Sequence, residues 1–214
     1  RLCDWRDLER LSAQVRRAVR AGQGAIEPFA FLSEDSTPAE QLACAQLRAQ
    51  TVAARVAPLP PAPPRADGPL RLGFLSNGFG AHPTGLLTAA FFEALAAHED
   101  CHVYLFALNR DDGSAIRQRL AAAAHALHDV SAQPHVAIAS RIRDAGIDVL
   151  YDLRGWGGGG RPEVLAMRPA PVQVNWLAYP GTSGAPWIDH VLADPVVLPD
   201  ALAAHFSERV VRLP

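Results

Sequence analysis

Three turn-like segments of the sequence hold the side chains best suited to chemistry, and each follows a short apolar run. The first spans residues 76–85, where His82 stands among glycines and precedes Pro83 and Thr84. A histidine with an ordinary pKa of about 6.5 suits a general base, and glycines at a helix start offer backbone N–H groups to an anion or a sugar. The alternative is a histidine that only caps the following helix.

The second segment begins at Asp152 and runs through Gly155 and Trp156 into four consecutive glycines, residues 157–160. An aspartate at the end of a strand could orient a histidine or accept a proton. The structural alternative is a carboxylate that caps its own loop. The glycines could allow the backbone to approach a ligand closely, or they could form a mobile flap. The third alternative is a flexible connection with no function.

The third segment is the turn Tyr179-Pro180-Gly181-Thr182-Ser183, which follows a predicted strand. Its two hydroxyl groups could hydrogen-bond a sugar or a phosphate. Turns also use such residues routinely to bond their own backbone, so a purely structural role is the alternative.

Several kinds of site are disfavoured by what the sequence lacks. All 20 basic residues are arginine, which excludes a Schiff-base lysine and a P-loop lysine. The sequence contains no HExxH, GxSxG or Cys–His signature, which disfavours metal and acyl-enzyme chemistry. The His82 turn is not a GxGxxG dinucleotide fingerprint, which disfavours nicotinamide chemistry. The histidine pairs 98/102 and 125/128 lack an evident third ligand, so we expect no metal site.

Charge and composition narrow the class further. A formal charge of −2 gives no general attraction to nucleic acid or to an acidic membrane. No apolar run approaches the roughly 20 residues that cross a bilayer. We therefore expect that the protein binds neither a nucleic acid nor a membrane. Three widely spaced cysteines indicate a reducing compartment, and we expect a cytoplasmic protein. The first residues include no initiator Met, which suggests a piece of a longer chain.

The elements before the first site segment divide the chain into parts. Apolar residues at three- and four-residue steps predict a helix over 4–22, and a capping-box pattern predicts another over 37–57, with a buried loop at 28–32 between them. The proline-rich residues 58–69 then read as an extended linker. We therefore predict a helical connector over 1–57, a linker over 58–69 and a main domain over 70–214.

The main domain alternates apolar strands with helices, which predicts an α/β fold with a parallel sheet covered on both faces. Ligands of such sheets collect at the carboxyl ends of the strands, where the three site segments lie. The predicted strands are 70–75, 101–107, 147–151, 171–176, 190–193 and 209–213, and the predicted helices are 84–98, 114–126, 134–145 and 163–167.

Five stretches in this order carry a resemblance to a known family: LRLGFLSNGFGAHPTG, FALNRDDGSAIRQRL, DVLYDLRGW, LAMRPAPVQVNWLAYPGTSG and IDHVLADPVVLP. Together they resemble the O-linked N-acetylglucosamine (O-GlcNAc) transferase family over residues 70–214. Residues 3–57 resemble the stretch that joins that family's tetratricopeptide repeats to its catalytic region. No intact 34-residue repeat is visible in the chain.

The resemblance implies a GT-B glycosyltransferase with two Rossmann-like lobes, of which this chain is the N-terminal one. The C-terminal lobe, which holds most of the UDP-sugar, would follow residue 214. The implied reaction is inverting and metal-independent: a protein Ser or Thr hydroxyl attacks UDP-N-acetylglucosamine (UDP-GlcNAc) and expels UDP. The implied partners are acceptor proteins, the UDP-sugar and the second lobe of the same chain, with no cofactor.

The resemblance also implies roles for residues. His82 matches the family's HPT histidine near acceptor and sugar, and Asp152 matches an acidic or amide position that relays a proton through water. The base is either of these groups or the departing phosphate. One departure stands at Gly155-Trp156-Gly157, where the family commonly has Gly, then Tyr or His, then Thr. The implied substrate-binding residues are Pro83, Thr84, Gly155, Trp156, Gly157, Tyr179, Pro180, Gly181, Thr182 and Ser183.

Two other functions stay open at this point. The first is a non-catalytic helical-repeat interaction module, whose lobe kept the fold and lost the reaction; the altered Gly155–Gly160 loop favours it. The second is a transferase that uses another sugar nucleotide, because the lobe that selects the donor is not in the chain.

Overall fold

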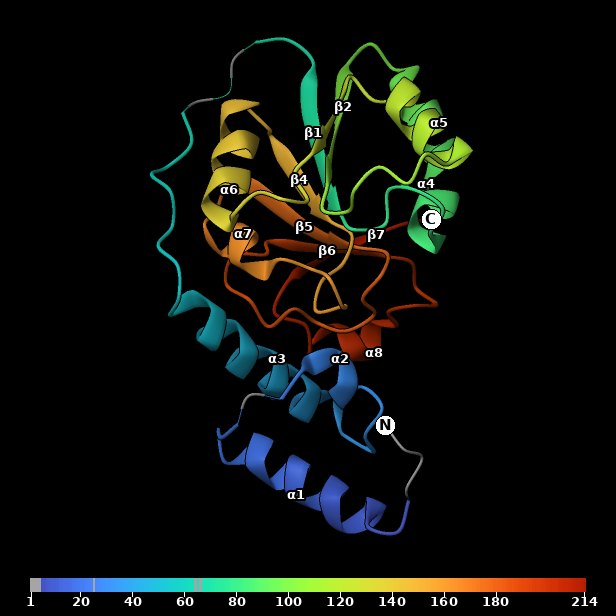
Figure 1. Ribbon diagram of the computed structural model, residues 1–214. Coiled ribbons are helices and arrows are strands. Elements are labelled where there is room, and N and C mark those ends of the chain that lie inside the picture. Colours follow the sequence, from blue (N-terminus) through green and yellow to red (C-terminus); the bar gives the residue numbers. More distant parts are fainter. Residues whose placement is uncertain (1–4, 25, 64, 66) are drawn as a thin grey trace.

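Seven strands form one all-parallel sheet, in the order β3-β2-β1-β4-β5-β6-β7 (Figure 1). The computed structural model describes residues 5–24, 26–63, 65 and 67–214; Cys3 and two linker residues, Pro64 and Ala66, lie outside this range. The strands are β1 (Leu70–Ser76), β2 (Cys101–Ala107), β3 (Ala126–Asp129), β4 (Val149–Asp152), β5 (Val172–Trp176), β6 (His190–Ala193) and β7 (Arg209–Arg212). The predicted parallel α/β fold is confirmed.

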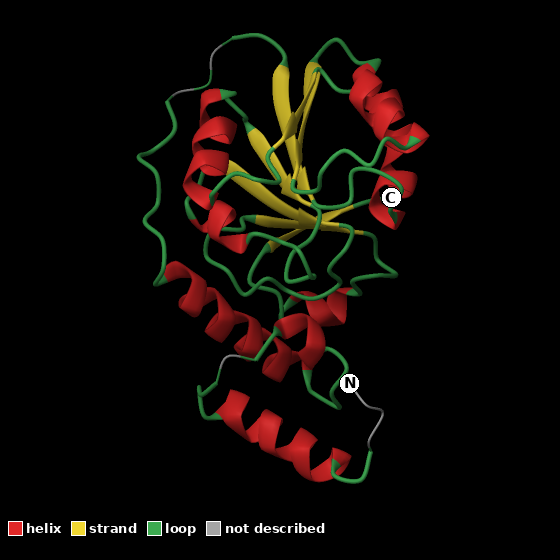
Figure 2. Cartoon of the chain, viewed as in Figure 1, coloured by secondary structure: helices red, strands yellow, loops and turns green. Residues whose placement is uncertain are grey.

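Helices cover the sheet on both faces (Figure 2). On one face, α4 (Pro83–Ala96) and α5 (Ala115–Ala123) close a core around Phe74 and Phe92, whose rings lie 4.8 Å apart. On the other face, α6 (His135–Asp144) and α7 (Pro162–Ala166) bury a second core that includes fully buried Leu150. Burial on both faces explains why the strands read as short, nearly continuous apolar runs.

Two elements of the lobe were missed or misplaced by the sequence pattern. The helix expected over 114–126 ends at Ala123, and its last predicted residue starts β3, which pairs Ala126 with Tyr104 of β2. Helix α8 (Asp200–Ala203) was not predicted. Both are short and weakly patterned, and β3 forms because β2 offers a free hydrogen-bonding edge.

The amino-terminal segment holds α1 (Leu8–Arg20), α2 (Pro28–Phe31) and α3 (Pro38–Ala53). The expected loop at 28–32 is wrong, because Pro28 occupies the first position of a short helix, where its missing N–H costs nothing. The expected capping box of α3 is confirmed: Glu40 donates its N–H to the Thr37 hydroxyl at 3.2 Å, and its carboxylate accepts the Thr37 N–H at 2.8 Å.

Helix α3 packs on the lobe, as Figure 1 shows. Its residues Ala49 and Val52 are fully buried in the same cluster as Val164 and Trp187 of the lobe. The residues after it run extended along the lobe, where the Leu59 N–H donates to the Met167 carbonyl at 2.8 Å. Helix α3 and the lobe therefore share one hydrophobic core, whereas Val19 and Phe31 of α1 and α2 form a separate small cluster with Cys44. The division at residues 57 and 69 stays a prediction.

The strand order reverses its direction next to β1. From β1 the chain moves outward through β2 to β3, then returns to the other side of β1 and continues through β4 to β7. The loops after β1 and β4 therefore flank the topological switch point, which is the position where open α/β sheets bind ligands.

Candidate functional site

The three chemistry-bearing segments meet at one edge of the sheet. They follow β1, β4 and β5, which are neighbours, and the register pairs Leu75 with Asp152 and Asp152 with Asn175. Because the strands are parallel, all three loops leave from the same edge. The structure thus brings together the His82 turn, the Asp152 loop and the Tyr179 turn.

The His82 turn is held from outside by the connection between β2 and α5. The Asn109 amide bonds both backbone groups of Phe79, accepting its N–H at 3.1 Å and donating to its carbonyl at 2.8 Å. The Asp112 carboxylate accepts the Ala81 N–H at 2.7 Å, and the buried Arg117 guanidinium donates to the Phe79 carbonyl at 2.9 Å. These three side chains lie in the FALNRDDGSAIRQRL stretch, where sequence reasoning gave them no role.

His82 is the N-cap of α4. Its backbone is extended, with φ −137° and ψ 150°, and its Nδ1 atom accepts the Thr84 N–H at 3.1 Å. The capping interpretation is therefore confirmed. In an uncharged imidazole whose Nδ1 accepts a hydrogen bond, the ring proton is on Nε2, so Nε2 is a hydrogen-bond donor. Pro83 is exposed at the first position of the helix, and Thr84 is buried behind it.

Asp152 caps the loop that follows its own strand. Its two carboxylate oxygens accept the N–H groups of Arg154 at 2.9 Å and Gly155 at 3.0 Å. Burial raises the pKa of this carboxyl group to about 6, although the two backbone donors and the nearby Arg154 charge act in the opposite direction. Within the described residues no hydrogen bond joins Asp152 to His82, so the carboxylate does not orient the imidazole.

The glycine loop after Asp152 is tied to the His82 side of the switch point. The Gly158 carbonyl accepts one hydrogen bond from the Asn77 amide at 3.1 Å and another from the Arg154 guanidinium. Gly155 has φ 51°, and a Cβ atom there would lie 2.6 Å from the Cβ of Tyr179. The loop is thus held by contacts on both sides and is not a flexible connection without function.

Trp156 points into the protein. Its side chain is 8% exposed, and its indole N–H donates to the Ser183 carbonyl at 2.9 Å. The guanidinium of Arg48 on α3 lies 5.9 Å from its ring centre. The neighbouring Gly157 is half-buried and bonds its N–H to the Arg154 carbonyl at 2.9 Å. Trp156 therefore links the second loop to the third loop and to α3.

The third loop exposes Pro180 and buries the residues around it. Burial raises the pKa of the Tyr179 phenol, and a Cβ atom on Gly181 would come within 2.8 Å of the phenol oxygen. Thr182 and Ser183 are 4% and 5% exposed. Their hydroxyl groups bond within the chain, so this loop presents Pro180 to the surface.

Thr182 has no hydrogen-bonding capacity left for a ligand. Its hydroxyl donates to the Glu208 carboxylate at 2.6 Å and accepts the N–H groups of Gly184 at 3.2 Å and Ser207 at 3.1 Å. One donated and two accepted bonds saturate a hydroxyl group. Glu208 lies 26 residues further along the chain, and no short motif pointed to it.

An apolar hollow of about 310 Å³ adjoins the third loop between the ends of β5 and β6. It is lined by Asn175, Trp176, Leu177, Tyr179, Pro180, Val191, Leu192, Ala193, Asp194, Val197, Leu198, Phe206 and Leu213. Asn175 is 1% exposed, and both atoms of its amide lack a hydrogen-bond partner and a solvent-accessible surface. The amide therefore lies behind the wall of the hollow.

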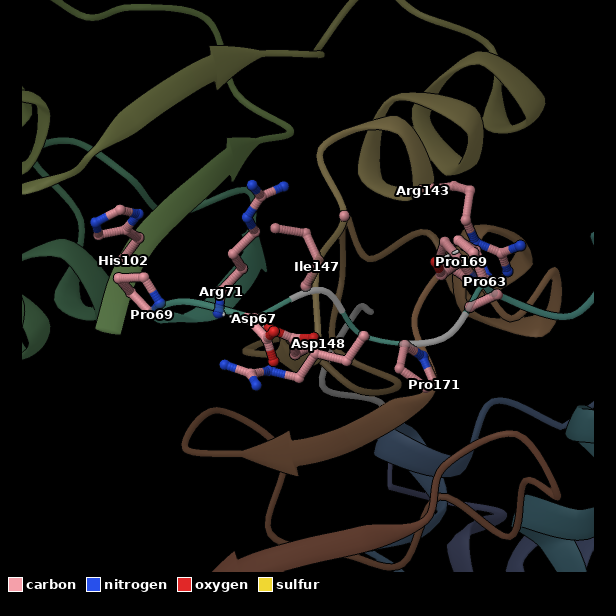
Figure 3. A pocket seen from close by; sticks show the side chains of 13 residues that line it. Pro63, Asp67, Pro69, Arg71, His102, Arg143, Ile147, Asp148, Pro169 and Pro171 are labelled. Carbon is pink, nitrogen blue, oxygen red and sulfur yellow. Dashed lines mark hydrogen bonds and ion pairs between the residues drawn. The ribbon is translucent and has the colours of Figure 1, made fainter. Parts of the chain in front are cut away.

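A second hollow, of about 210 Å³, lies at the opposite edge of the sheet (Figure 3). It is formed by the linker and the starts of β1, β2 and β4, with Arg71, His102 and Asp148 among its lining residues. Its Arg143 is bonded within the protein, because the guanidinium donates to the carbonyls of Pro60, Arg168 and Pro169. Because it lies at the amino ends of the strands, this hollow is not the candidate site.

The described residues bring no three His, Cys, Asp or Glu side chains together in a way that could hold a metal ion. A search of the same residues for a helix long and apolar enough to cross a membrane finds none.

Comparison with known proteins identifies the family. The model of glycosyl transferase family 41 matches residues 47–214. The chain belongs to glycosyl transferase family 41. The match begins inside α3, which agrees with the packing of that helix on the lobe.

Several relatives of this family-41 chain carry related names. A probable UDP-N-acetylglucosamine–peptide N-acetylglucosaminyltransferase (SEC) of Arabidopsis thaliana is 33% identical over 230 residues, which covers 100% of this chain and 23% of the relative. The UDP-N-acetylglucosamine–peptide N-acetylglucosaminyltransferase of Caenorhabditis elegans is 36% identical over 146 residues, which covers 68% of this chain and 13% of the relative. The expected family resemblance is confirmed.

A solved structure matches the fold. A mutant O-GlcNAc transferase of Thermobaculum terrenum superimposes with a TM-score of 0.78 and 28% identity, over 94% of this chain and 41% of that one. The Rossmann-like lobe expected for a GT-B enzyme is therefore confirmed. This family-41 chain spans less than half the length of the relatives it matches.

Proposed function

We propose that this chain is the N-terminal, acceptor-side lobe of a GT-B enzyme that transfers N-acetylglucosamine from UDP-GlcNAc to Ser or Thr hydroxyls of proteins. The observation that carries the proposal is the His82 turn at the switch point of a family-41 lobe, joined there by the Asp152 and Tyr179 loops. Inversion at the anomeric carbon and metal independence belong to the same proposal and rest on the family resemblance.

His82 acts in this proposal as a hydrogen-bond donor. With Nδ1 occupied by the Thr84 N–H, an uncharged ring has no lone pair on Nε2 and cannot accept a proton there. Its Nε2–H instead donates to a substrate oxygen where negative charge develops. The acceptor hydroxyl attacks the anomeric carbon, the bond to the diphosphate breaks, and an oxygen of the departing UDP takes the hydroxyl proton.

The other site residues divide into three groups. Pro83, Gly157 and Pro180 are at least partly exposed and are proposed to contact the substrates. Asp152, Trp156 and Thr182 are buried and act through the loops that they hold. The buried or half-buried Thr84, Gly155, Tyr179, Gly181 and Ser183 belong to the same proposed site and shape its walls.

The lobe requires a partner to complete the reaction. We propose that a second Rossmann-like lobe of the same protein supplies most of the contacts to UDP, since this lobe offers a diphosphate no side-chain cation other than arginine or protonated histidine. Residues 1–57 are proposed to connect to a tetratricopeptide-type region, with residues 58–69 as the linker. The unpaired thiols of Cys44 and Cys101 support a cytoplasmic location.

Release of UDP from UDP-GlcNAc by the full-length protein, with a pool of Ser- and Thr-containing peptides as acceptors, tests the proposal. We expect peptide-dependent UDP release by wild type and none by His82→Ala, whose circular dichroism spectrum stays native. Transfer by residues 1–214 alone would contradict the two-lobe proposal. Parallel assays with UDP-glucose and UDP-N-acetylgalactosamine test the other sugar nucleotides. Faster turnover of either one would show that it, and not UDP-GlcNAc, is the donor.

A non-catalytic interaction module is the second candidate, and the Gly155–Gly160 loop favours it. This loop carries glycine at position 157, where the family commonly has Thr, and it packs Trp156 inward. Calorimetric titration with UDP separates the two functions, because an adaptor binds no UDP and hydrolyses no UDP-sugar.

A further inference from the structure

The buried carboxylate of Glu208 lies behind the candidate site. Glu208 directly precedes β7 and is 4% exposed. One oxygen accepts the Ser183 N–H at 2.6 Å, and the other accepts the hydroxyl of Thr182 at 2.6 Å and that of Ser207 at 3.1 Å. No ion pair to Glu208 occurs in the part of the chain that the structure describes. A buried carboxylate with no cation depends on these donors for its stability.

The donors belong to the loop that also fixes the second site segment. The Ser183 carbonyl accepts the indole N–H of Trp156 at 2.9 Å, and Tyr179 packs against the bare Cα of Gly155. The Gly155 N–H in turn bonds the Asp152 carboxylate at 3.0 Å. A continuous series of contacts thus leads from Glu208 through the third loop to the Asp152 loop at the switch point.

We infer that Glu208 is a positioning residue for the transfer reaction: its carboxylate holds Thr182 and Ser183, and through them fixes the third loop against the Asp152 loop. The inference rests on the proposed function. It assigns the Thr182 hydroxyl and the Ser183 N–H of the YPGTSG turn to an internal carboxylate rather than to a sugar or a phosphate. It also places a determinant of the site in the β6–β7 connection.

The hydrogen-bond inventory predicts that an amide cannot replace this carboxylate. The Thr182 hydroxyl already accepts two N–H groups, so its proton must go to an acceptor. Glu208→Gln offers one oxygen to three donors, the Ser183 N–H and the hydroxyls of Thr182 and Ser207, and it replaces the second oxygen with an NH2 group that cannot accept the Thr182 proton. Thr182→Val removes the same contact from the other side at nearly constant volume, whereas Thr182→Ser keeps the hydroxyl.

The test is a double-mutant cycle on the full-length enzyme, with kcat and KM from UDP release and UDP affinity from calorimetry. We expect Glu208→Gln and Thr182→Val each to lower kcat at least about tenfold with unchanged UDP affinity, since a charge-assisted hydrogen bond is lost in each. The double variant should be no worse than the poorer single variant, because both remove one interaction. Thr182→Ser should retain activity, and Glu99→Gln, at an exposed site, serves as the matched control.

Hydrogen exchange gives a readout that does not depend on turnover. We expect Glu208→Gln to raise amide exchange in residues 152–158 and 179–184 and to leave that of α4 and α5 unchanged. If Glu208→Gln does not fold, Thr182→Val carries the same comparison. Wild-type kcat in Glu208→Gln, additive losses in the double variant, or unchanged exchange in both loops would overturn the inference. A wild-type enzyme that releases no UDP would instead overturn the proposed function.

Discussion

His82 Nδ1 accepts the backbone N–H of Thr84 at 3.1 Å, so the side chain that starts helix α4 belongs to the loop at the switch-point edge of the sheet. The two interpretations of this histidine, a helix cap and a chemical group, are therefore compatible. The cap selects the ring nitrogen that remains available, and it makes that nitrogen a donor in the uncharged ring. The local helix start thereby determines which chemistry the side chain can do.

Replacement of His82 by Asn separates the cap from the chemistry. Asn is among the best N-cap residues, so His82→Asn should keep the free energy of unfolding within about 0.5 kcal/mol of wild type. It removes the Nε2 donor, and we expect UDP release by the full-length enzyme to fall about 100-fold. Urea denaturation and the transferase assay measure the two effects. His82→Ala is the control that loses both functions, with about 1 kcal/mol of stability. Wild-type turnover in His82→Asn would remove the imidazole from the reaction.

The buried carboxyl group of Asp152 should make stability fall as the pH rises. Its folded pKa of about 6 lies above the ordinary value of 3.8, so the folded state binds more protons between these values and is destabilised on ionisation. The difference corresponds to about 3 kcal/mol. Asp152→Asn cannot ionise, so the free energy of unfolding of the variant minus that of wild type should increase by up to this amount between pH 4 and pH 7. Urea titrations across this range measure it, and a constant difference would show that the carboxyl group titrates normally.

The glycine loop provides a matched pair of alanine substitutions. Gly155→Ala adds a Cβ atom 2.6 Å from the Cβ of Tyr179 in a backbone with φ 51°, so we expect a loss of at least about 2 kcal/mol of stability. A Cβ atom on Gly158 meets no atom within 4 Å, and Gly158→Ala should stay within about 0.5 kcal/mol of wild type. Thermal denaturation of both variants checks this, and equal effects would mean that Gly155 does not make the close contact with Tyr179.

Arg143 should determine how firmly the linker is held. Its guanidinium donates to the carbonyls of Pro60, Arg168 and Pro169, which joins the linker to the loop before β5. Arg143→Met removes all three bonds while keeping much of the apolar stem, so trypsin cleavage after Arg65 should become severalfold faster. Arg141→Met, at an exposed position of the same helix, is the control and should be cleaved at the wild-type rate. An equal cleavage rate in both variants would show that other contacts hold the linker.

Much of the fold could be predicted from local patterns. The apolar runs of β1, β2 and β5 and the capping box at Thr37 are signals that lie within a few residues of each other, and the structure has each of them. The short α2 and β3 were missed or misread because four residues carry little pattern of their own. Strand β3 is defined by its partner β2, which a local pattern does not contain.

The sequence by itself determined an α/β fold, and that His82, Asp152 and the YPGTSG turn follow the ends of strands. Those conclusions depend on residue types and short spacings, whereas the family came from the resemblance of five stretches and was confirmed by comparison. Only the tertiary structure decided what each group does, because a hydroxyl or a carboxylate is assigned by the partner that saturates it. Thr182 is bonded to Glu208, 26 residues away, and Trp156 to Ser183, 27 residues away. Such pairs form only when the sheet brings distant loops to one edge, so the division between exposed and loop-holding residues followed from the fold.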